Sequence, residues 1–178
     1  MGITMQICRM NYNDLSDNGR KAKFHCYGVG IFDVFSGQDP YVNKSECSYI
    51  EKSAIPPGQY WIVDRPVGSI ANQVRGTALD MIHGTNHSQW FGLYSFQTMN
   101  DYIFVNGVRR GAFRLHPLRP NGSGESWGCI TFYRVSDFNI VRNALLRTHK
   151  FKVPGSSLMA YDRVDVTGNT NFGACKVS

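Results

Sequence analysis

A histidine and a cysteine lie close together in the segment 113–132, FRLHPLRPNGSGESWGCITF. An apolar run ends at His116, a polar glycine-rich loop follows, and Cys129 opens the next apolar run. The thiolate is the reactive form of cysteine, and a neighbouring imidazole is the usual group that generates it. A disulfide, a buried thiol, a metal ligand and a nucleophile are the roles open to Cys129 at this point.

Gly128, next to Cys129, would allow a sharp turn and a close approach of substrate. The backbone N–H groups of Gly128 and Cys129 could then point at a developing oxyanion. A histidine that ends one strand and a cysteine that begins the next can face each other across a loop. The spacing is compatible with a Cys–His pair and also with an ordinary buried cysteine.

The elements that would carry this pair are predicted to be short strands. Glycine (18 residues) and proline (7) punctuate the chain throughout, which suits many turns. Asn106-Gly107, between two apolar runs, is a hairpin signal. The predicted strands are 23–35, 59–64, 103–105, 111–116, 129–133 and 158–166.

One helix is predicted over 136–150, with Ser136 and Asp137 as its cap. Apolar residues follow at roughly helical spacing, and basic residues favour the C-terminal end. These are Phe138, Val141, Leu145 and Leu146, then Arg147, His149 and Lys150. A second, weaker helix is predicted over 69–78. We therefore expect a mostly-β sandwich or partly open barrel with one or two packed helices, and a site on loops at one end.

Length and composition restrict the classes of function. With 178 residues and 42% hydrophobic residues, the chain suits one domain, 1–178, with a sizeable core. No apolar run approaches about 18 residues, so we expect no membrane insertion. We also see no Sec-type signal peptide. The net charge of +6 is scattered, which argues against nucleic acid and leaves an acidic polymer such as a cell wall open as a partner.

The five cysteines form an odd set without a CxxC pair, so a structural zinc knuckle is not expected. Four could form two disulfides and leave one free thiol, for which Cys129 is the candidate. Five reduced cysteines remain an alternative. Cys26–Cys47 and Cys8–Cys175 are conceivable pairs, but sequence cannot give connectivity and none is assigned.

Ser126-Trp127-Gly128-Cys129-Ile130 after His116 resembles the active-site signature of YkuD-type L,D-transpeptidases. The segments AIPPGQYWI, NGVRRGAFRLHP, WGCITF and VSDFNIVRNALL resemble, more specifically, the L,D-transpeptidase-like type VI secretion effectors, which are antibacterial toxins. The resemblance runs in order from about Ala54 to Val166.

The resemblance implies an activity on peptidoglycan stem peptides and no cofactor. Cys129 would attack the amide between meso-diaminopimelate and D-alanine, and His116 would be its general base. Water as acceptor gives L,D-carboxypeptidase activity, and a free D-amino acid gives exchange. The secretion machinery would deliver the protein to the target cell's periplasm, and the producing cell would need an immunity protein.

The chain also departs from the family pattern near the cysteine. Trp127 replaces the common histidine before the Gly-Cys pair, and Thr131 replaces an Arg or Asn that contacts substrate. Arg119 or Arg114 could supply the missing cation for a substrate carboxylate. The expected substrate contacts are Ser126, Trp127, Arg119, Arg114 and Thr131.

Met81-Ile82-His83-Gly84-Thr85-Asn86 resembles the segment around the catalytic histidine of housekeeping L,D-transpeptidases. The segment 113–117 and the strand–loop–strand geometry favour His116 as the base over His83. His83 and His87 have a helical spacing that suits zinc, but the Gly84-Thr85-Asn86 turn argues against a metal. Four aromatic residues could line a substrate groove, with a packed core favoured: Trp90, Phe91, Tyr94 and Phe96.

Two other functions compete with the acyl-transfer hypothesis. One is a non-catalytic wall-binding or interaction module in which Cys129 is merely buried. The other is a general cysteine peptidase that cleaves ordinary L,L peptide bonds.

Overall fold

The structure is a computed structural model that describes residues 7–66, 89–119 and 127–176. The helix predicted over 69–78 lies outside these residues. The elements in chain order are β1 (Ile7–Ser16), β2 (Lys21–Cys26), β3 (Gly30–Phe35), η1 (Ser45–Cys47), β4 (Gly58–Asp64), β5 (Phe91–Ser95), β6 (Tyr102–Val105), β7 (Val108–Gly111), β8 (Arg114–Pro117), β9 (Ile130–Phe132), α2 (Val135–Arg147), β10 (Phe151–Lys152), β11 (Met159–Ala160), β12 (Asp162–Thr167) and η3 (Phe172–Ala174).

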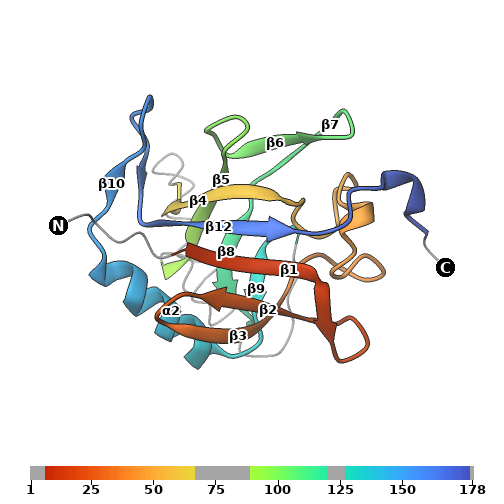
Figure 1. Ribbon diagram of the computed structural model, residues 1–178, viewed down its shortest axis with the longest axis horizontal. Coiled ribbons are helices and arrows are strands. Elements are labelled where there is room, and N and C mark those ends of the chain that lie inside the picture. The colour runs from red at the N-terminus through yellow and green to blue at the C-terminus, as the bar shows by residue number, and fades with distance from the viewer. Residues whose placement is uncertain (1–6, 67–88, 120–126, 177–178) are drawn as a thin grey trace.

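Eight strands pair in the order β1-β12-β4-β5-β8-β9-β3-β2, and β2 pairs back to β1 to close a barrel. Two of the pairings, β1–β12 and β8–β9, are parallel, and the other six are antiparallel. The barrel is joined by only two paired residues at β5–β8 and by two at β3–β9. Figure 1 shows β1, β12 and β4 crossing the front of the molecule, with β8 and β9 behind them. The prediction of a mostly-β fold with a packed helix is confirmed.

α2 packs against β8 and β9 through Phe138, Val141 and Leu145, which are all buried. The ring of Phe138 contacts those of Phe91 and Phe132. The predicted start was wrong, because Arg134 is the N-cap residue and no side chain caps the helix. Leu146 is exposed, since it points away from the buried stripe, and the helix ends before His149 and Lys150.

The hairpin predicted at Asn106-Gly107 is confirmed. These residues have φ of 49° and 77° and join β6 to β7, as expected for a tight two-residue turn. The predicted strand 23–35 is instead two strands, because the chain turns at residues 27–29 between β2 and β3. The run 111–116 is also broken, since Ala112 has a φ of 59°, outside the strand region. Two of the barrel strands, β1 and β5, were not predicted.

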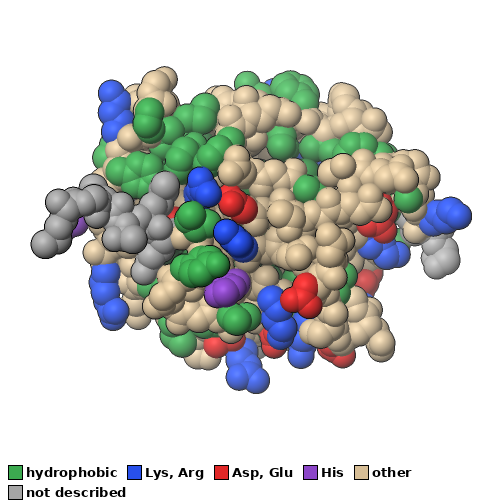
Figure 2. Space-filling model, in the orientation of Figure 1, with side chains coloured by type: hydrophobic (Ala, Val, Ile, Leu, Met, Phe, Trp, Pro, Cys, Tyr) green, Lys and Arg blue, Asp and Glu red, His purple; other side chains and the backbone are tan. Residues whose placement is uncertain are grey.

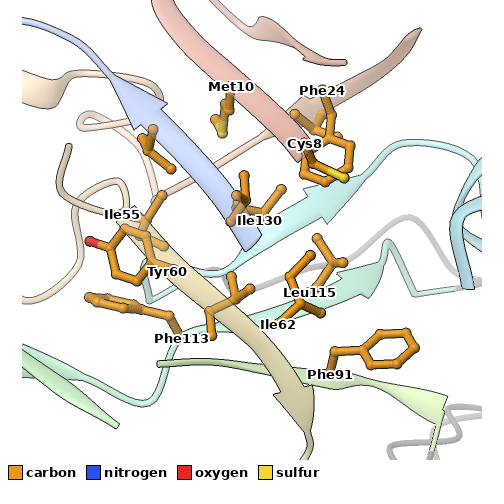
Figure 3. Packing of buried hydrophobic residues seen from close by; sticks show 14 of the residues in the cluster. Cys8, Met10, Phe24, Ile55, Tyr60, Ile62, Phe91, Phe113, Leu115 and Ile130 are labelled. Carbon is orange, nitrogen blue, oxygen red and sulfur yellow. The ribbon is translucent and has the colours of Figure 1, made fainter. Parts of the chain in front are cut away.

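The core fills the barrel with side chains from every wall. Figure 3 shows Met10 and Phe24 from β1 and β2 on one side, and Tyr60, Phe113 and Leu115 on the other. Tyr60 and Phe113 meet edge to face with ring centroids 5.9 Å apart. The hydroxyl of Tyr60 is buried among apolar side chains and donates a hydrogen bond to the carbonyl of Pro56.

Two disulfides join Cys8 to Cys26 and Cys47 to Cys175, so neither of the conceivable pairs is found. Cys8 and Cys26 are opposite each other in the β1–β2 register. Cys47–Cys175 ties η1 to the segment after η3 and spans 128 residues of sequence. Cys129 takes part in neither disulfide, as predicted for the odd cysteine.

The charged side chains do not gather into one patch. Figure 2 shows basic groups scattered over this face and several acidic groups beside them. Ion pairs such as Arg20–Asp39 and Lys150–Asp64 account for part of this pattern. Within the described segments, no helix has the length and apolar character needed to cross a bilayer.

Candidate active site

His116 and Cys129 are positioned by two adjacent parallel strands. In the β8–β9 register, Leu115 lies opposite Ile130 and His116 lies opposite Thr131. Leu115 and Ile130 belong to the core cluster, and alternation along a strand places His116 and Thr131 on the other face. β8 and β9 run in the same direction, as a parallel pair.

Cys129 directly precedes β9, whose first residue, Ile130, lies opposite Leu115. It is two residues from Thr131, so the same alternation places it on the face that carries His116. The expected distance between the β-carbons of such diagonal neighbours is about 7 Å. His116 and Cys129 thus share one face of one strand pair, rather than facing each other across an antiparallel hairpin.

The imidazole of His116 is held on two sides. Its Nδ1 lies 2.9 Å from the carbonyl oxygen of Pro117, and its ring stacks on that of Trp90 at 4.1 Å. A carbonyl oxygen can only accept, so Nδ1 carries the proton in the neutral ring. The lone pair is therefore on Nε2, which lies 3.4 Å from the hydroxyl of Thr131. In this tautomer Nε2 is the basic nitrogen that can accept a proton from a nucleophile.

Cys129 is only 8% exposed, and burial raises the pKa of its thiol to about 11. Opposing this effect, the backbone N–H groups of Arg114 and Trp127 hydrogen-bond to the sulfur, and the charges of Arg114 and Arg110 favour the thiolate. Burial is the larger effect, so the thiol is protonated at neutral pH. Chemistry at this sulfur consequently needs a base to remove the proton during attack.

Gly128 cannot be replaced without disturbing its neighbours. Its φ of +99° is in the region that side chains disfavour. A β-carbon at this position would lie 2.5 Å from the ring of Phe113 and 2.7 Å from Nη2 of Arg110. The glycine before the cysteine is thus required by packing as well as by the turn.

Arg110 explains how the turn before Cys129 is held. This side chain is 4% exposed and lies on the inner side of β7. Its Nη1 donates to the carbonyls of Ser48 and Ala54 and to the hydroxyl of Ser53, and its Nη2 donates to the carbonyls of Glu51, Ser53 and Trp127. One guanidinium therefore joins the 48–54 loop to the residue two positions before Cys129.

Sequence analysis did not single out Arg110, although a signal was available. The Asn106-Gly107 turn sets the register that places Arg110 opposite Ile103. Ile103 is apolar and faces the core, so its cross-strand partner had to face inward as well. A buried arginine must find acceptors, and here carbonyl groups provide most of them.

The residues that were predicted to contact substrate lie in different environments. Arg114 is engaged by Asp101 through two hydrogen bonds of 2.8 Å. Thr131 is fully buried beside His116. Trp127 is 42% exposed, with the ammonium of Lys52 5.8 Å from its ring.

Arg119 is half-buried and makes no ion pair with any residue that the structure describes. Ser126, His83 and His87 lie outside the described residues. The roles assigned to these side chains stay predictions.

The four aromatic residues of 90–96 divide between three environments. Phe91 is in the barrel core, as the packing interpretation expected. Tyr94 and Phe96 pack with Trp61 on the outer face of the sheet. Trp90 differs from the other three, because it stacks on His116 and so belongs to the candidate site.

The fold and the site together define a small β-barrel domain with a buried thiol and an oriented histidine on adjacent parallel strands. Comparison with protein families then assigns the chain: the model of the Tlde1 domain matches residues 30–156, and the chain belongs to this family of type VI secretion effectors. The matched region includes His116, Cys129 and Arg110. No curated protein matches the chain.

Proposed function

We propose that this effector is a cysteine acyl-transfer enzyme that acts on the stem tetrapeptides of peptidoglycan. The observation that carries the proposal is the parallel β8–β9 register, which sets His116 opposite Thr131, two residues after Cys129, together with the unprotonated Nε2 of His116. Family membership and the resemblance of the 113–132 segment to L,D-transpeptidases support the choice of substrate.

In the first half-reaction, Sγ of Cys129 bonds to the carbonyl carbon between meso-diaminopimelate and D-alanine. The thiol proton passes to Nε2 of His116 as that bond forms, because a thiol with a pKa of about 11 does not ionise beforehand. The carbon–nitrogen bond then breaks, His116 returns the proton to the leaving amine, and D-alanine departs. An acyl-enzyme remains on Cys129.

In the second half-reaction, water or a free D-amino acid attacks the carbonyl carbon of the acyl-enzyme, and Nε2 of His116 takes its proton. The carbon–sulfur bond then breaks, and His116 returns the proton to Sγ of Cys129. Water releases a tripeptide, and the amine restores a tetrapeptide with a different last residue. Either product removes or alters the tetrapeptides that a target cell uses for crosslinking. We propose the target periplasm as the place of action and an immunity protein as the protection of the producing cell.

The environment suggests positioning roles for two residues that were expected to contact substrate. Thr131 is fully buried, and its hydroxyl faces Nε2 of His116, so we assign it to orienting the imidazole. Arg114 is already bound by Asp101, and its backbone N–H and its charge both favour the thiolate. Trp127 and Arg119 remain the proposed contacts for substrate.

A second candidate is a non-catalytic wall-binding module, and one observation favours it. The low exposure and raised pKa of Cys129 are those of a structural buried thiol. In that case the site would bind stem peptides without changing them.

Mass spectrometry of purified tetrapeptide muropeptides distinguishes the candidates. Wild type, Cys129→Ala and His116→Ala are each incubated with and without a D-amino acid. The control is His25→Ala, which removes a histidine that stacks on Tyr27 rather than on Trp90. An ordinary L,L peptide is included as a second substrate.

The proposal expects wild type and His25→Ala to remove or exchange the terminal D-alanine, both site variants to be inactive, and the L,L peptide to stay intact. An unchanged tetrapeptide with wild type, or full activity of Cys129→Ala, would reject it. Binding without turnover would favour the wall-binding module.

A further inference from the structure

Asp162, the first residue of β12, is a fully buried carboxyl group with an unusual environment. Its Oδ1 accepts a hydrogen bond from the backbone N–H of Arg163. Its Oδ2 is buried and has no hydrogen-bond partner among the residues that the structure describes. A buried carboxylate oxygen without a donor is costly, so this group calls for a positive partner.

The carboxyl group lies beside the Cys8–Cys26 pair. The two sulfur atoms and a carboxylate oxygen of Asp162 all lie within 4.8 Å of one another. The three residues come from β1, β2 and β12, which are neighbours in the barrel, and each is at most 1% exposed. Figure 3 shows Cys8 next to Phe24, at the β1–β2 side of the core.

We propose that Cys8, Cys26 and Asp162 bind one Zn²⁺ ion when the two cysteines are in their dithiol form. Two thiolates and a carboxylate are donors that Zn²⁺ takes in proteins, and a spacing below 5 Å suits a shared ion. The ion would give Oδ2 of Asp162 its positive partner.

The disulfide and the metal exclude each other. A dithiol reductant gives two electrons and two protons to the Cys8–Cys26 bond, which breaks into two thiols while the reductant becomes a disulfide. Zn²⁺ then displaces the two thiol protons. This inference rests on the proposed role as a secreted effector: such a protein would be synthesised in the cytoplasm, where thiols are kept reduced. Zn²⁺ would tie β1, β2 and β12 together until the disulfide replaces it.

The test isolates this cluster from the other cysteines, because Cys129 lies near a histidine and could bind metal by itself. A protein with Cys47→Ser, Cys175→Ser and Cys129→Ser, here the triple variant, keeps only the proposed ligands. It is reduced and titrated with Co²⁺ and then with Zn²⁺. We expect one Co²⁺ per chain with a thiolate-to-metal absorption band, displaced by Zn²⁺, and no binding by the oxidised form.

Single changes in the triple variant test each ligand. Cys8→Ser should abolish the absorption band, and Asp162→Ala should weaken binding at least about tenfold. Asp165→Ala is the matched control, because this acid of the same strand pairs with Arg163 and should leave the affinity unchanged.

Absence of Co²⁺ binding by the reduced, folded triple variant would overturn the proposal, as would equal binding after Cys8→Ser. If reduction unfolds the chain, Zn²⁺ must restore its circular dichroism spectrum in the triple variant and not in the Cys8→Ser form. Failure to restore it there would also overturn the proposal.

Discussion

Loss of Arg110 should destabilise the site most, although Arg110 takes no part in the proposed proton transfer or bond formation. Arg110→Met keeps the length of the side chain and removes every donor. Six hydrogen bonds disappear, and the carbonyls of Ser48, Ala54 and Trp127 lose a charged partner. Bonds to a charged donor contribute about 1.5–3 kcal/mol each, so simple addition would approach the total stability of a domain.

The expected loss is smaller than that sum, because the 48–54 loop can relax and water can reach some of the carbonyls. Breaking a buried charged network typically costs about 3–5 kcal/mol, and we expect Arg110→Met to fall in this range. Arg110→Lys should lose about half as much, since one ammonium cannot reach both groups of acceptors. The free energy of unfolding is measured in urea at neutral pH.

Arg109→Met is the matched control. Its guanidinium lies over the ring of Tyr102 at 4.3 Å on the exposed side of the same hairpin, so the loss should stay below about 1 kcal/mol. Arg110→Met should also slow alkylation of Cys129, because the charge of Arg110 lowers the pKa of that thiol. A destabilisation of Arg110→Met no larger than that of Arg109→Met would refute the assigned role.

Three further predictions concern a glycine, a thiol and a buried acid. Gly128→Ala should lower the free energy of unfolding by about 2–4 kcal/mol, because backbone strain and overpacking add. Gly155→Ala should lower it by only about 1 kcal/mol, because Gly155 has a φ of +76° but open space around it. Equal losses of the two variants in urea unfolding would show that the Phe113 contact is unimportant. The rate of iodoacetamide reaction at Cys129 should rise about tenfold per pH unit above neutrality and level off only near pH 11, since the thiolate is the reacting form. A plateau of this rate below about pH 8 would contradict the buried environment of the thiol. Asp162 has a pKa raised to about 7 from 3.8, so its contribution to stability is full below about pH 4 and is lost as pH rises through 7. Asp162→Asn should therefore gain stability relative to wild type between about pH 4 and pH 8, and a constant difference in urea unfolding across that range would contradict the shift.

Local signals were sufficient to predict several elements of the fold. The apolar spacing of Phe138, Val141 and Leu145 predicted α2, and Asn106-Gly107 predicted the β6–β7 hairpin. Both depend on interactions between residues that are close in sequence. β1 was missed although buried Cys8, Met10 and Tyr12 alternate with exposed polar residues, a period-two pattern that indicates a strand.

The candidate site was only partly accessible to sequence reasoning. Cys129 could be selected because its loop context is distinctive and because five cysteines leave one unpaired. The other pairings could not be predicted, since Cys47 and Cys175 meet only after the whole barrel has formed. Trp90 was named as a possible groove residue with core packing favoured, and Arg110 was not selected. Long-range packing brings these two residues to His116 and Trp127.

The sequence by itself determined the groups that are available for chemistry: an odd number of cysteines with Cys129 in a glycine-rich context, a histidine 13 residues before it, and the flanking glycine. Side-chain type and local spacing are enough for that conclusion. The tertiary structure alone decided that β8 and β9 run parallel, that Nδ1 of His116 is the protonated nitrogen, and that the thiol is buried. The strand pairing and the desolvation exist only once distant segments have packed together, whereas the proton on Nδ1 is set by the carbonyl of the neighbouring residue Pro117 in its folded conformation.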